Sequence, residues 1–213
     1  MSTPLEVYAL IGVCEAAALV ARSGSIDWLC WPRFDSAACF AALLGTPDNG
    51  RWLIAAVDEH ARVTRTYRGH TLILETRIET ADGAVLLIDF MPPRGRNSDI
   101  VRLVRGERGR VRMRMELVLR FDYGRTVPWV TRMDDGTLRA IAGPDLVTLH
   151  TPAPIRGEDL KTVAEFEVAA GETVPFVLTH GPSNHKPPKA IDPNAALDET
   201  EKFWMKWAAK NKS

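Results

Sequence analysis

The residues best suited to chemistry lie in one short stretch, Trp31-Pro32-Arg33-Phe34-Asp35-Ser36. It combines two aromatic rings with a guanidinium and a carboxylate, where a plain connection would carry Gly, Ser and Asn. Aromatic rings stack on the apolar faces of sugars, and Arg and Asp form hydrogen bonds with hydroxyl groups. These residue types suit a loop that contacts a substrate or a second protein surface.

A purely structural explanation fits the same stretch. In that explanation Trp31 and Phe34 plug one end of a β-sandwich and touch no ligand. The residue types favour neither explanation, so both stay open. A second group with similar side chains, Tyr123, Arg125 and Trp129, is predicted to serve a similar interface.

The stretch is held between two predicted elements. Residues 25–30 alternate in hydropathy as a half-buried strand does, and Pro32 ends this strand because it has no backbone N–H. Asp35 or Ser36 then caps a predicted short helix near 37–44. An amphipathic strand would thus deliver the loop, with a helix fixing its far end.

The rest of the chain predicts a mainly β protein, a large antiparallel two-sheet β-sandwich. Turn signals recur about every ten residues, and helical periodicity is nearly absent before residue 190. Strands expected at 100–104 and 111–121 flank a predicted turn at 107–109. Asp134-Asp135-Gly136 and Ala170-Gly171-Glu172 predict two further turns between neighbouring strands.

The C-terminal part differs from the rest, and we divide the chain into a sandwich domain at 1–181 and a linker with a helix at 182–213. The linker is rich in proline, which indicates a semi-rigid segment. The closing helix carries Phe203, Trp204 and Trp207 on one face, so it requires a partner surface. A second copy of the chain, giving a homodimer, is one such partner.

Composition argues against several classes of function. Lys plus Arg and Asp plus Glu both number 27, and a net charge of zero argues against nucleic acid. Within the arginine-rich segment 102–120, Arg110, Arg112 and Arg114 alternate with apolar residues, which favours the solvated face of a strand over a phosphate-binding role. The five histidines and three cysteines lack metal-type spacing, so neither a metal nor another cofactor is expected. Without a signal peptide or a membrane-length apolar run, a cytoplasmic protein is expected.

Several segments, in order along the chain, carry a family resemblance. They are Ala17-Ala18-Leu19-Val20, Gly24 to Cys30, Pro32 to Ser36, Phe40 to Gly45, Asp89 to Pro92 and Phe121 to Arg125. Together they resemble the N-terminal domain of glycoside hydrolase family 15 proteins of the bacterial glucoamylase and trehalase type. The resemblance implies a two-sheet super-sandwich that leads into a helical-barrel catalytic domain, which hydrolyses an α-glucosidic bond with inversion.

Glycoside hydrolysis needs two carboxylic acids, and the resemblance places both in the helical barrel, outside these 213 residues. We therefore expect a non-catalytic domain that stabilises the barrel and shapes its pocket entrance, with α-glucosides meeting it at the domain interface. One alternative is a free-standing carbohydrate-binding or assembly module with Trp31, Trp129 or Trp204 as its exposed platform. Another is a self-sufficient sandwich glycosidase that uses a pair among Asp27, Asp35, Glu75, Asp89 and Asp122.

Overall fold

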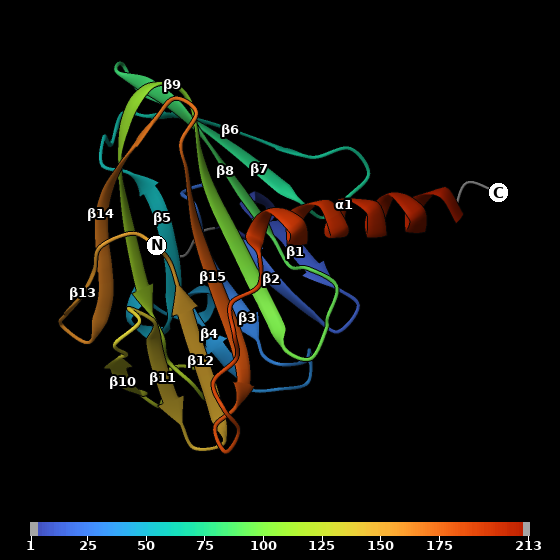
Figure 1. The fold of residues 1–213 in the computed structure, drawn as a ribbon, viewed down its shortest axis with the longest axis vertical. Helices are drawn as coiled ribbons and strands as arrows, with labels where there is room; N and C mark the ends of the chain where they lie inside the picture. The colour runs from blue at the N-terminus through green and yellow to red at the C-terminus, as the bar shows by residue number, and fades with distance from the viewer. Residues whose placement is uncertain (1–3, 211–213) are drawn as a thin grey trace.

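The computed structural model describes residues 4–210 as an antiparallel β protein with one α-helix at its C-terminal end (Figure 1). The strands are β1 (Ala9–Val13), β2 (Ala16–Val20), β3 (Ser25–Cys30), β4 (Ala38–Phe40), β5 (Arg51–Ala56), β6 (Arg62–Tyr67), β7 (Leu74–Glu79), β8 (Gly83–Phe90), β9 (Ser98–Val118), β10 (Trp129–Arg132), β11 (Leu138–Ala142), β12 (Asp145–His150), β13 (Ile155–Glu158), β14 (Lys161–Ala169) and β15 (Thr173–Pro182). The helix is α1 (Pro193–Lys210), and short 3-10 turns lie at Leu5–Val7, Ala42–Leu44 and Pro47–Asn49.

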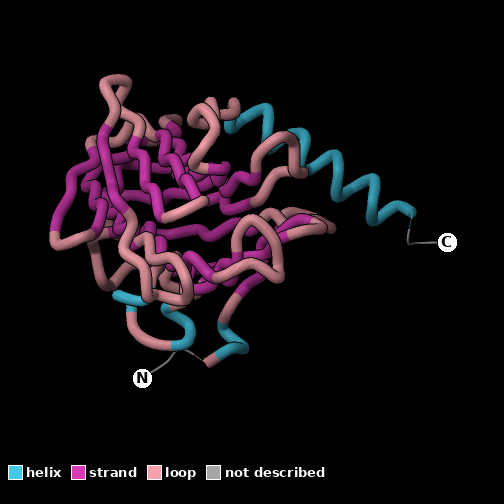
Figure 2. Tube along the Cα trace, turned by 90° about the horizontal axis from the view of Figure 1, so that it is seen from below, coloured by secondary structure: helices cyan, strands magenta, loops and turns pink. Residues whose placement is uncertain are grey.

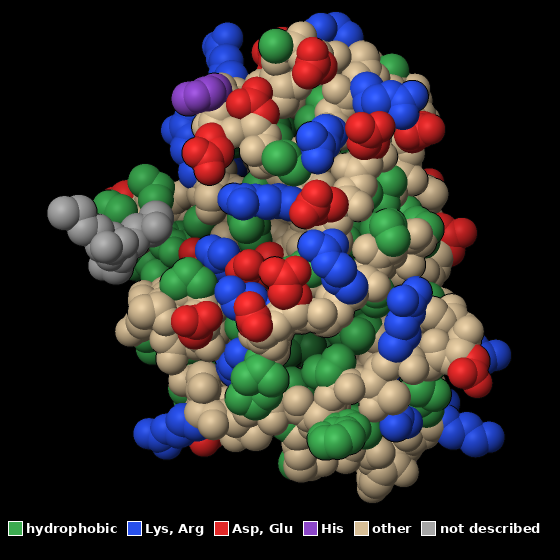
Figure 3. Space-filling view, turned by 90° about the vertical axis from the view of Figure 1, so that its left-hand side faces the viewer, with side chains coloured by type: hydrophobic (Ala, Val, Ile, Leu, Met, Phe, Trp, Pro, Cys, Tyr) green, Lys and Arg blue, Asp and Glu red, His purple; other side chains and the backbone are tan. Residues whose placement is uncertain are grey.

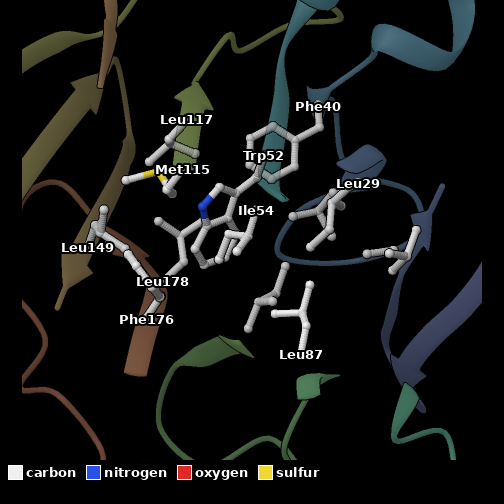
Figure 4. Close-up of a cluster of buried hydrophobic side chains, with 14 of the residues drawn as sticks. Leu29, Phe40, Trp52, Ile54, Leu87, Met115, Leu117, Leu149, Phe176 and Leu178 are labelled. Atoms are coloured by element: carbon white, nitrogen blue, oxygen red, sulfur yellow. The ribbon is translucent and has the colours of Figure 1, made fainter. Parts of the chain in front are cut away.

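The strands form two layers that share β9. The first half of β9 pairs with β8 and β15, and its second half pairs with β5 and β14. One layer therefore runs from β6 to β10 and the other from β1 to β13, joined through β9 into one continuous sheet. The hydrophobic core lies between the layers, around Trp52, Ile54, Leu87 and Leu178 (Figure 4). The predicted two-layer antiparallel architecture is confirmed.

The predicted turn at 107–109 is not formed. Instead β9 runs unbroken from Ser98 to Val118 and passes from one layer to the other. A Cβ atom at Gly106 would lie 1.9 Å from the Ala169 carbonyl oxygen, and Gly109 has a φ of 58°. These glycines allow a close backbone approach and a bend, which glycine in a strand permits, so the local turn signal marks a bend within one strand.

The predicted helix near 37–44 is also wrong. Residues 38–40 form β4, which pairs with β3, and only a 3-10 turn at 42–44 is helical. The hydroxyl oxygen of Ser36 accepts a hydrogen bond from the backbone N–H of Arg33, so it closes a local turn and caps no helix. All three residues of β4 are buried, and this burial outweighs the helical propensity of the segment.

The arginine-rich segment 102–120 divides into two kinds of environment. Over 110–115 the arginines face solvent and the intervening apolar residues are buried, as predicted. At the two ends of the segment, outside the predicted alternation, Arg102 and Arg120 are buried. Alternation along a strand decides toward which side of the sheet a side chain points. The bend in β9 changes which of these two sides is covered by the rest of the protein.

A buried ion pair joins the two layers. Arg102 on β9 and Asp89 on β8 are 0% exposed, and two N–H···O hydrogen bonds of 2.8 and 3.2 Å connect them. The same guanidinium donates to the carbonyl oxygens of Trp52 and Gly24 in the other layer, each at 2.6 Å, and lies 5.1 Å from the centre of the Trp52 ring. A buried charge is tolerated when it is paired and fully hydrogen-bonded, as it is here.

The helix α1 begins where the linker composition predicts. The Asp192 side chain accepts hydrogen bonds from the backbone N–H groups of Asn194 and Ala195, as an N-cap does. Ala196 and Leu197 pack on the outer face of the layer that contains β8, β9 and β15, while the second half of α1 extends beyond the sandwich (Figure 2). Within residues 4–210, no helix is long and apolar enough to cross a membrane.

Candidate functional site

The stretch from Trp31 to Ser36 leaves the end of β3 and closes one end of the sandwich. Trp31 is 4% exposed, and its indole N–H donates to the Ser98 hydroxyl oxygen at 2.8 Å. The Trp31 ring also packs against the His180 ring, with 5.6 Å between centres. Trp31 therefore plugs the sandwich end, as the structural explanation predicts, and it is too deeply buried to serve as an exposed platform.

Two polar pairs that the sequence analysis does not identify lie near the end loop, on opposite faces of β15, and one of them includes the His180 ring that contacts Trp31. The His180 ring is hydrogen-bonded to Asp145 at 2.9 Å, and the Thr179 hydroxyl donates to Asp99 at 2.5 Å. Burial lowers the pKa of His180, although the Asp145 carboxylate partly opposes this, and burial raises the pKa of Asp99. Strand pairing of β15 with β9 brings Thr179 beside Asp99, and its pairing with β12 brings His180 near Asp145. The local signal is two consecutive polar residues, 179 and 180, in a largely apolar strand.

The rest of the loop is exposed. The Arg33 guanidinium pairs with Asp35 through hydrogen bonds of 3.0 and 3.3 Å, and the Phe34 side chain is 60% exposed. The Phe34 backbone N–H donates to the Glu15 carbonyl oxygen at 2.9 Å, which ties the loop to the β1–β2 turn. These residues line a hollow of about 630 Å³ together with Arg94, which forms an ion pair with Glu15. A phenyl ring between a cation and an anion suits a contact that is partly apolar and partly polar.

The second group of candidates is split by the fold. Tyr123 is 46% exposed and leans on Trp28, with ring centres 6.2 Å apart, while Arg125 is exposed and lies 4.0 Å from Asp122. Phe121, Asp122 and Thr126 line a second hollow together with Trp31 and Ser36, so the two predicted segments meet there, but neither Tyr123 nor Arg125 lines it. Trp129 lines a different hollow and does not belong to this end surface.

The predicted interface helix carries an aromatic ladder. Phe203 and Trp204 make an edge contact with centres 5.2 Å apart, and Trp204 and Trp207 make another at 5.8 Å. Trp204 is buried, whereas Trp207 is 52% exposed and Met205 is 48% exposed. Trp204 therefore cannot be an exposed platform for a ligand, and the face of α1 becomes open toward its C-terminal end.

Every carboxylate raised as a catalytic candidate is held by a partner within the chain. The pairs are Asp27 with Tyr8 and Ser25, Asp35 with Arg33, Glu75 with Arg68, Asp89 with Arg102, and Asp122 with Arg125. A general acid in glycoside hydrolysis needs a raised pKa. Of the described carboxyl groups with a resolved shift, only Asp99 has its pKa raised, and Asp99 is buried. Within residues 4–210, no group of His, Cys, Asp and Glu side chains is placed to hold a metal ion.

Residues 1–204 match the family described as "Trehalase-like, N-terminal", which covers most of the chain. The protein therefore belongs to the trehalase-like N-terminal domain family.

Similar proteins are several times longer than this chain. Trehalase 1 of Sulfolobus acidocaldarius is 35% identical over 127 residues, covering 59% of this chain and 21% of that protein. The trehalase of Mycolicibacterium smegmatis is 26% identical over 231 residues, covering 96% of this chain and 34% of that protein. A solved structure described as a kojibiose phosphorylase from the human microbiome aligns with 95% of this chain and 29% of its own, at 11% identity and a TM-score of 0.40, a likeness too weak to support an argument. The chain thus spans at most about a third of the curated relatives it matches.

Proposed function

We propose that this chain is the non-catalytic N-terminal β-sandwich of a family 15 glycoside hydrolase of the glucoamylase or trehalase type. In this role it stabilises a helical-barrel catalytic domain and shapes the entrance of its α-glucoside pocket. Membership of the trehalase-like N-terminal family supports the proposal, as do relatives that are trehalases and extend well beyond the matched region. The internal partners of the five candidate carboxylates support a non-catalytic role.

The observation that carries the proposal is the open aromatic face of α1. Ala196 and Leu197 fix the first half of the helix to the sandwich, whereas Trp207, one turn beyond the buried Trp204, is 52% exposed at the other end. A large exposed aromatic ring that continues a partly buried aromatic row is typical of a contact surface. We assign the catalytic barrel to this surface. In a solution of the chain alone, the same surface is where a homodimer would form.

The exposed part of the end loop supports the second half of the proposal. Arg33, Phe34 and Asp35 stand on the rim of a hollow, while Trp31 anchors the loop from within. A loop with a buried anchor and an exposed polar and aromatic tip holds its tip in one place, which suits the lining of a pocket entrance. A barrel docked against this end would meet an α-glucoside at the interface between the domains.

The first experiment measures glucose release by the 213-residue chain from trehalose and from maltooligosaccharides. We expect no release above the buffer control, because each candidate carboxylate is paired within the chain. Reproducible release that disappears on Asp27→Asn or Asp35→Asn would overturn the non-catalytic role. That result would mean that the sandwich contains its own pair of catalytic acids.

The second experiment tests the supporting role in a chimera. This chain replaces the matched N-terminal part of the Mycolicibacterium smegmatis trehalase, and both the Tm and the rate of trehalose hydrolysis are measured. Trp207→Ala is expected to lower both, because it removes an aromatic contact from the proposed domain interface. Lys206→Ala, the neighbouring exposed position, is the matched control and should change neither. Equal behaviour of the two variants would contradict the proposed interface.

A further inference from the structure

A groove opens on the side of the sandwich where both layers end. β10 is the last strand of one layer and β13 is the last strand of the other. Between them lies a hollow of about 530 Å³, lined by residues of β9, β10, β11 and the β13–β14 hairpin. In Figure 3 hydrophobic side chains gather around a hollow in the lower half of the face that is shown. This groove is separate from the two hollows beside the end loop.

Two large apolar side chains line the groove while staying exposed. Trp129 on β10 is 79% exposed, and Leu160 in the β13–β14 turn is 73% exposed. Asp159 and Leu160 have φ values of 46° and 59° because they are the two central residues of the tight β13–β14 hairpin turn. Large exposed apolar side chains that gather at one hollow are typical of a contact site. Buried Leu117 and Leu138 form an apolar part of the same lining.

The groove also contains a buried cation without a counter-charge. Arg120 is 7% exposed, and its Nη1 donates to the carbonyl oxygens of Leu119 at 2.8 Å and Leu160 at 3.2 Å. No carboxylate of residues 4–210 forms an ion pair with Arg120, and its Nε and Nη2 have no hydrogen-bond acceptor in that part of the chain. A guanidinium has several N–H donors in a fixed fork, so unused donors beside the groove call for oxygen acceptors.

A second arginine crosses the groove. The Arg132 side chain on β10 reaches to the carbonyl oxygen of Ile155 on β13, at 3.4 Å. The facing edge strands also leave backbone N–H and C=O groups unpaired, which can bond hydroxyl groups. The lining carries the carboxylates of Glu158 and Asp159 beside the cations of Arg120, Arg132 and Lys161, and this mixture of charges suits a neutral polar ligand. The ligand class that fits is flat and apolar on one side, and rich in neutral oxygen acceptors.

We propose that this groove binds a short α-linked gluco-oligosaccharide. One pyranose ring would stack on Trp129, and its hydroxyl groups would accept hydrogen bonds from Arg120 and Arg132. The volume of the groove falls within the range of about 300–1,000 Å³ that is usual for small-ligand sites. The choice of α-linked glucose rests on the proposed function, whereas the aromatic stack and the arginine donors come from the groove itself.

The test is a calorimetric titration of the 213-residue chain with maltotriose and with trehalose, and with cellotriose as the β-linked comparison. We expect millimolar or tighter binding of an α-linked sugar. Trp129→Ala should weaken this binding about tenfold, since an aromatic stack contributes on the order of one tenfold step. Trp129 is so exposed that its replacement should leave the fold intact, which a far-ultraviolet circular dichroism spectrum checks.

Matched variants separate this groove from the other aromatic surfaces. Arg132→Ala should weaken binding, whereas Trp207→Ala on α1 should leave it unchanged. A flat titration with all three sugars would overturn the inference, and so would α-linked binding that Trp129→Ala does not weaken. Binding of cellotriose alone would overturn the α-linked assignment. The chimera experiment on α1 is independent of this titration. If the groove binds no sugar, the proposed domain role still stands. If the chimera variants behave alike, any sugar binding measured for the groove still stands.

Discussion

The centre of the sandwich and its end loop each contain an arginine, an aspartate and a tryptophan: Arg102, Asp89 and Trp52 in the centre, and Arg33, Asp35 and Trp31 in the loop. In both regions two N–H groups of the guanidinium bond the two carboxylate oxygens, at 2.8 and 3.2 Å in the centre and at 3.0 and 3.3 Å in the loop. The ion pairs are nearly alike in geometry. Their side chains are 0% exposed in the centre and 65% and 72% exposed in the loop.

Exposure to solvent, more than geometry, decides how much each ion pair contributes to stability. Removing one partner of a buried pair leaves an uncompensated charge, which destabilises a protein by about 3–5 kcal/mol. An exposed pair contributes only about 0–1 kcal/mol, because water and salt screen it. The central pair therefore holds the two layers together. The loop pair adds little to stability and is free to change partners when another surface approaches.

The largest effect is expected for the central pair. Arg102→Met should lower the free energy of unfolding by about 4 kcal/mol, because Asp89 would stay buried without its cation. Arg33→Met, the same change in the exposed pair, should lower it by less than about 1 kcal/mol. Urea unfolding of both variants measures the difference. Similar losses of unfolding free energy in the two variants would contradict the conclusion that burial decides the contribution of an ion pair.

The next effect separates the anchor of the loop from its tip. Trp31→Ala should destabilise the protein by about 3 kcal/mol, because it leaves a cavity and removes the hydrogen bond to Ser98. Phe34→Ala should change stability by no more than about 0.5 kcal/mol, since the ring is mostly exposed. Thermal unfolding distinguishes the two variants. If Phe34→Ala were the more damaging change, the division into anchor and tip would be wrong.

A smaller effect is expected from pH at the same end of the molecule. Burial lowers the pKa of His180, with Arg94 acting in the same direction and Asp145 against it. Between its folded pKa and the ordinary value near 6.5, the unfolded chain binds more protons than the folded one. Stability should therefore fall as pH falls below about 6.5, by at most about 1.4 kcal/mol per pH unit for this group.

The control for that pH dependence is a pair of histidine variants. His180→Gln should flatten the loss of stability between neutral and mildly acidic pH, whereas exposed His60→Gln should leave it unchanged. His150 also has a pKa lowered by burial, and Asp99 has one raised by burial, so both contribute to the total curve. Subtracting the curve of the variant from that of the unmodified chain cancels both contributions. An unchanged slope in His180→Gln would contradict the assignment.

The smallest effect on stability, and the one that bears most on function, is expected at the loop tip. In the trehalase chimera, Arg33→Ala should leave the Tm nearly unchanged and lower kcat/KM severalfold, if the tip shapes the pocket entrance. Arg110→Ala, which removes another exposed ion pair, should change neither quantity. If Arg33→Ala leaves kcat/KM unchanged, the loop only closes the end of the sandwich and does not shape the pocket entrance.

Much of the fold can be predicted from local sequence, because the residues of a hairpin turn are neighbours in the chain. Asp134-Asp135-Gly136 does join β10 to β11, and Ala170-Gly171-Glu172 joins β14 to β15. The continuity of β9 could not be predicted, since a glycine needed for close approach to Ala169 looks the same in sequence as a turn glycine. The strand at 38–40 escaped prediction because its pairing with β3 and its burial decide its conformation.

The candidate site was predictable only where neighbours in sequence are also neighbours in space. Arg33 and Asp35 are two positions apart, and their pairing lies within the segment that the sequence analysis identifies. Trp31 and Ser98 are 67 positions apart, so no local pattern could reveal that this indole is buried. For the same reason the burial of Arg102 could not be predicted, because its partners Trp52 and Gly24 lie 50 and 78 positions away. A buried arginine and an exposed one are indistinguishable until the strands are paired.

The shared strand β9 has a consequence for how the domain comes apart. Its backbone groups are hydrogen-bonded to four other strands, two in each layer, so neither layer can separate while β9 stays in place. The two layers should therefore unfold as one cooperative unit. Amide hydrogen exchange along the middle of β9 should occur only through global opening, whereas the edge strands β10 and β13 should exchange through local fraying. The pairing of this one strand thus couples the unfolding of both layers.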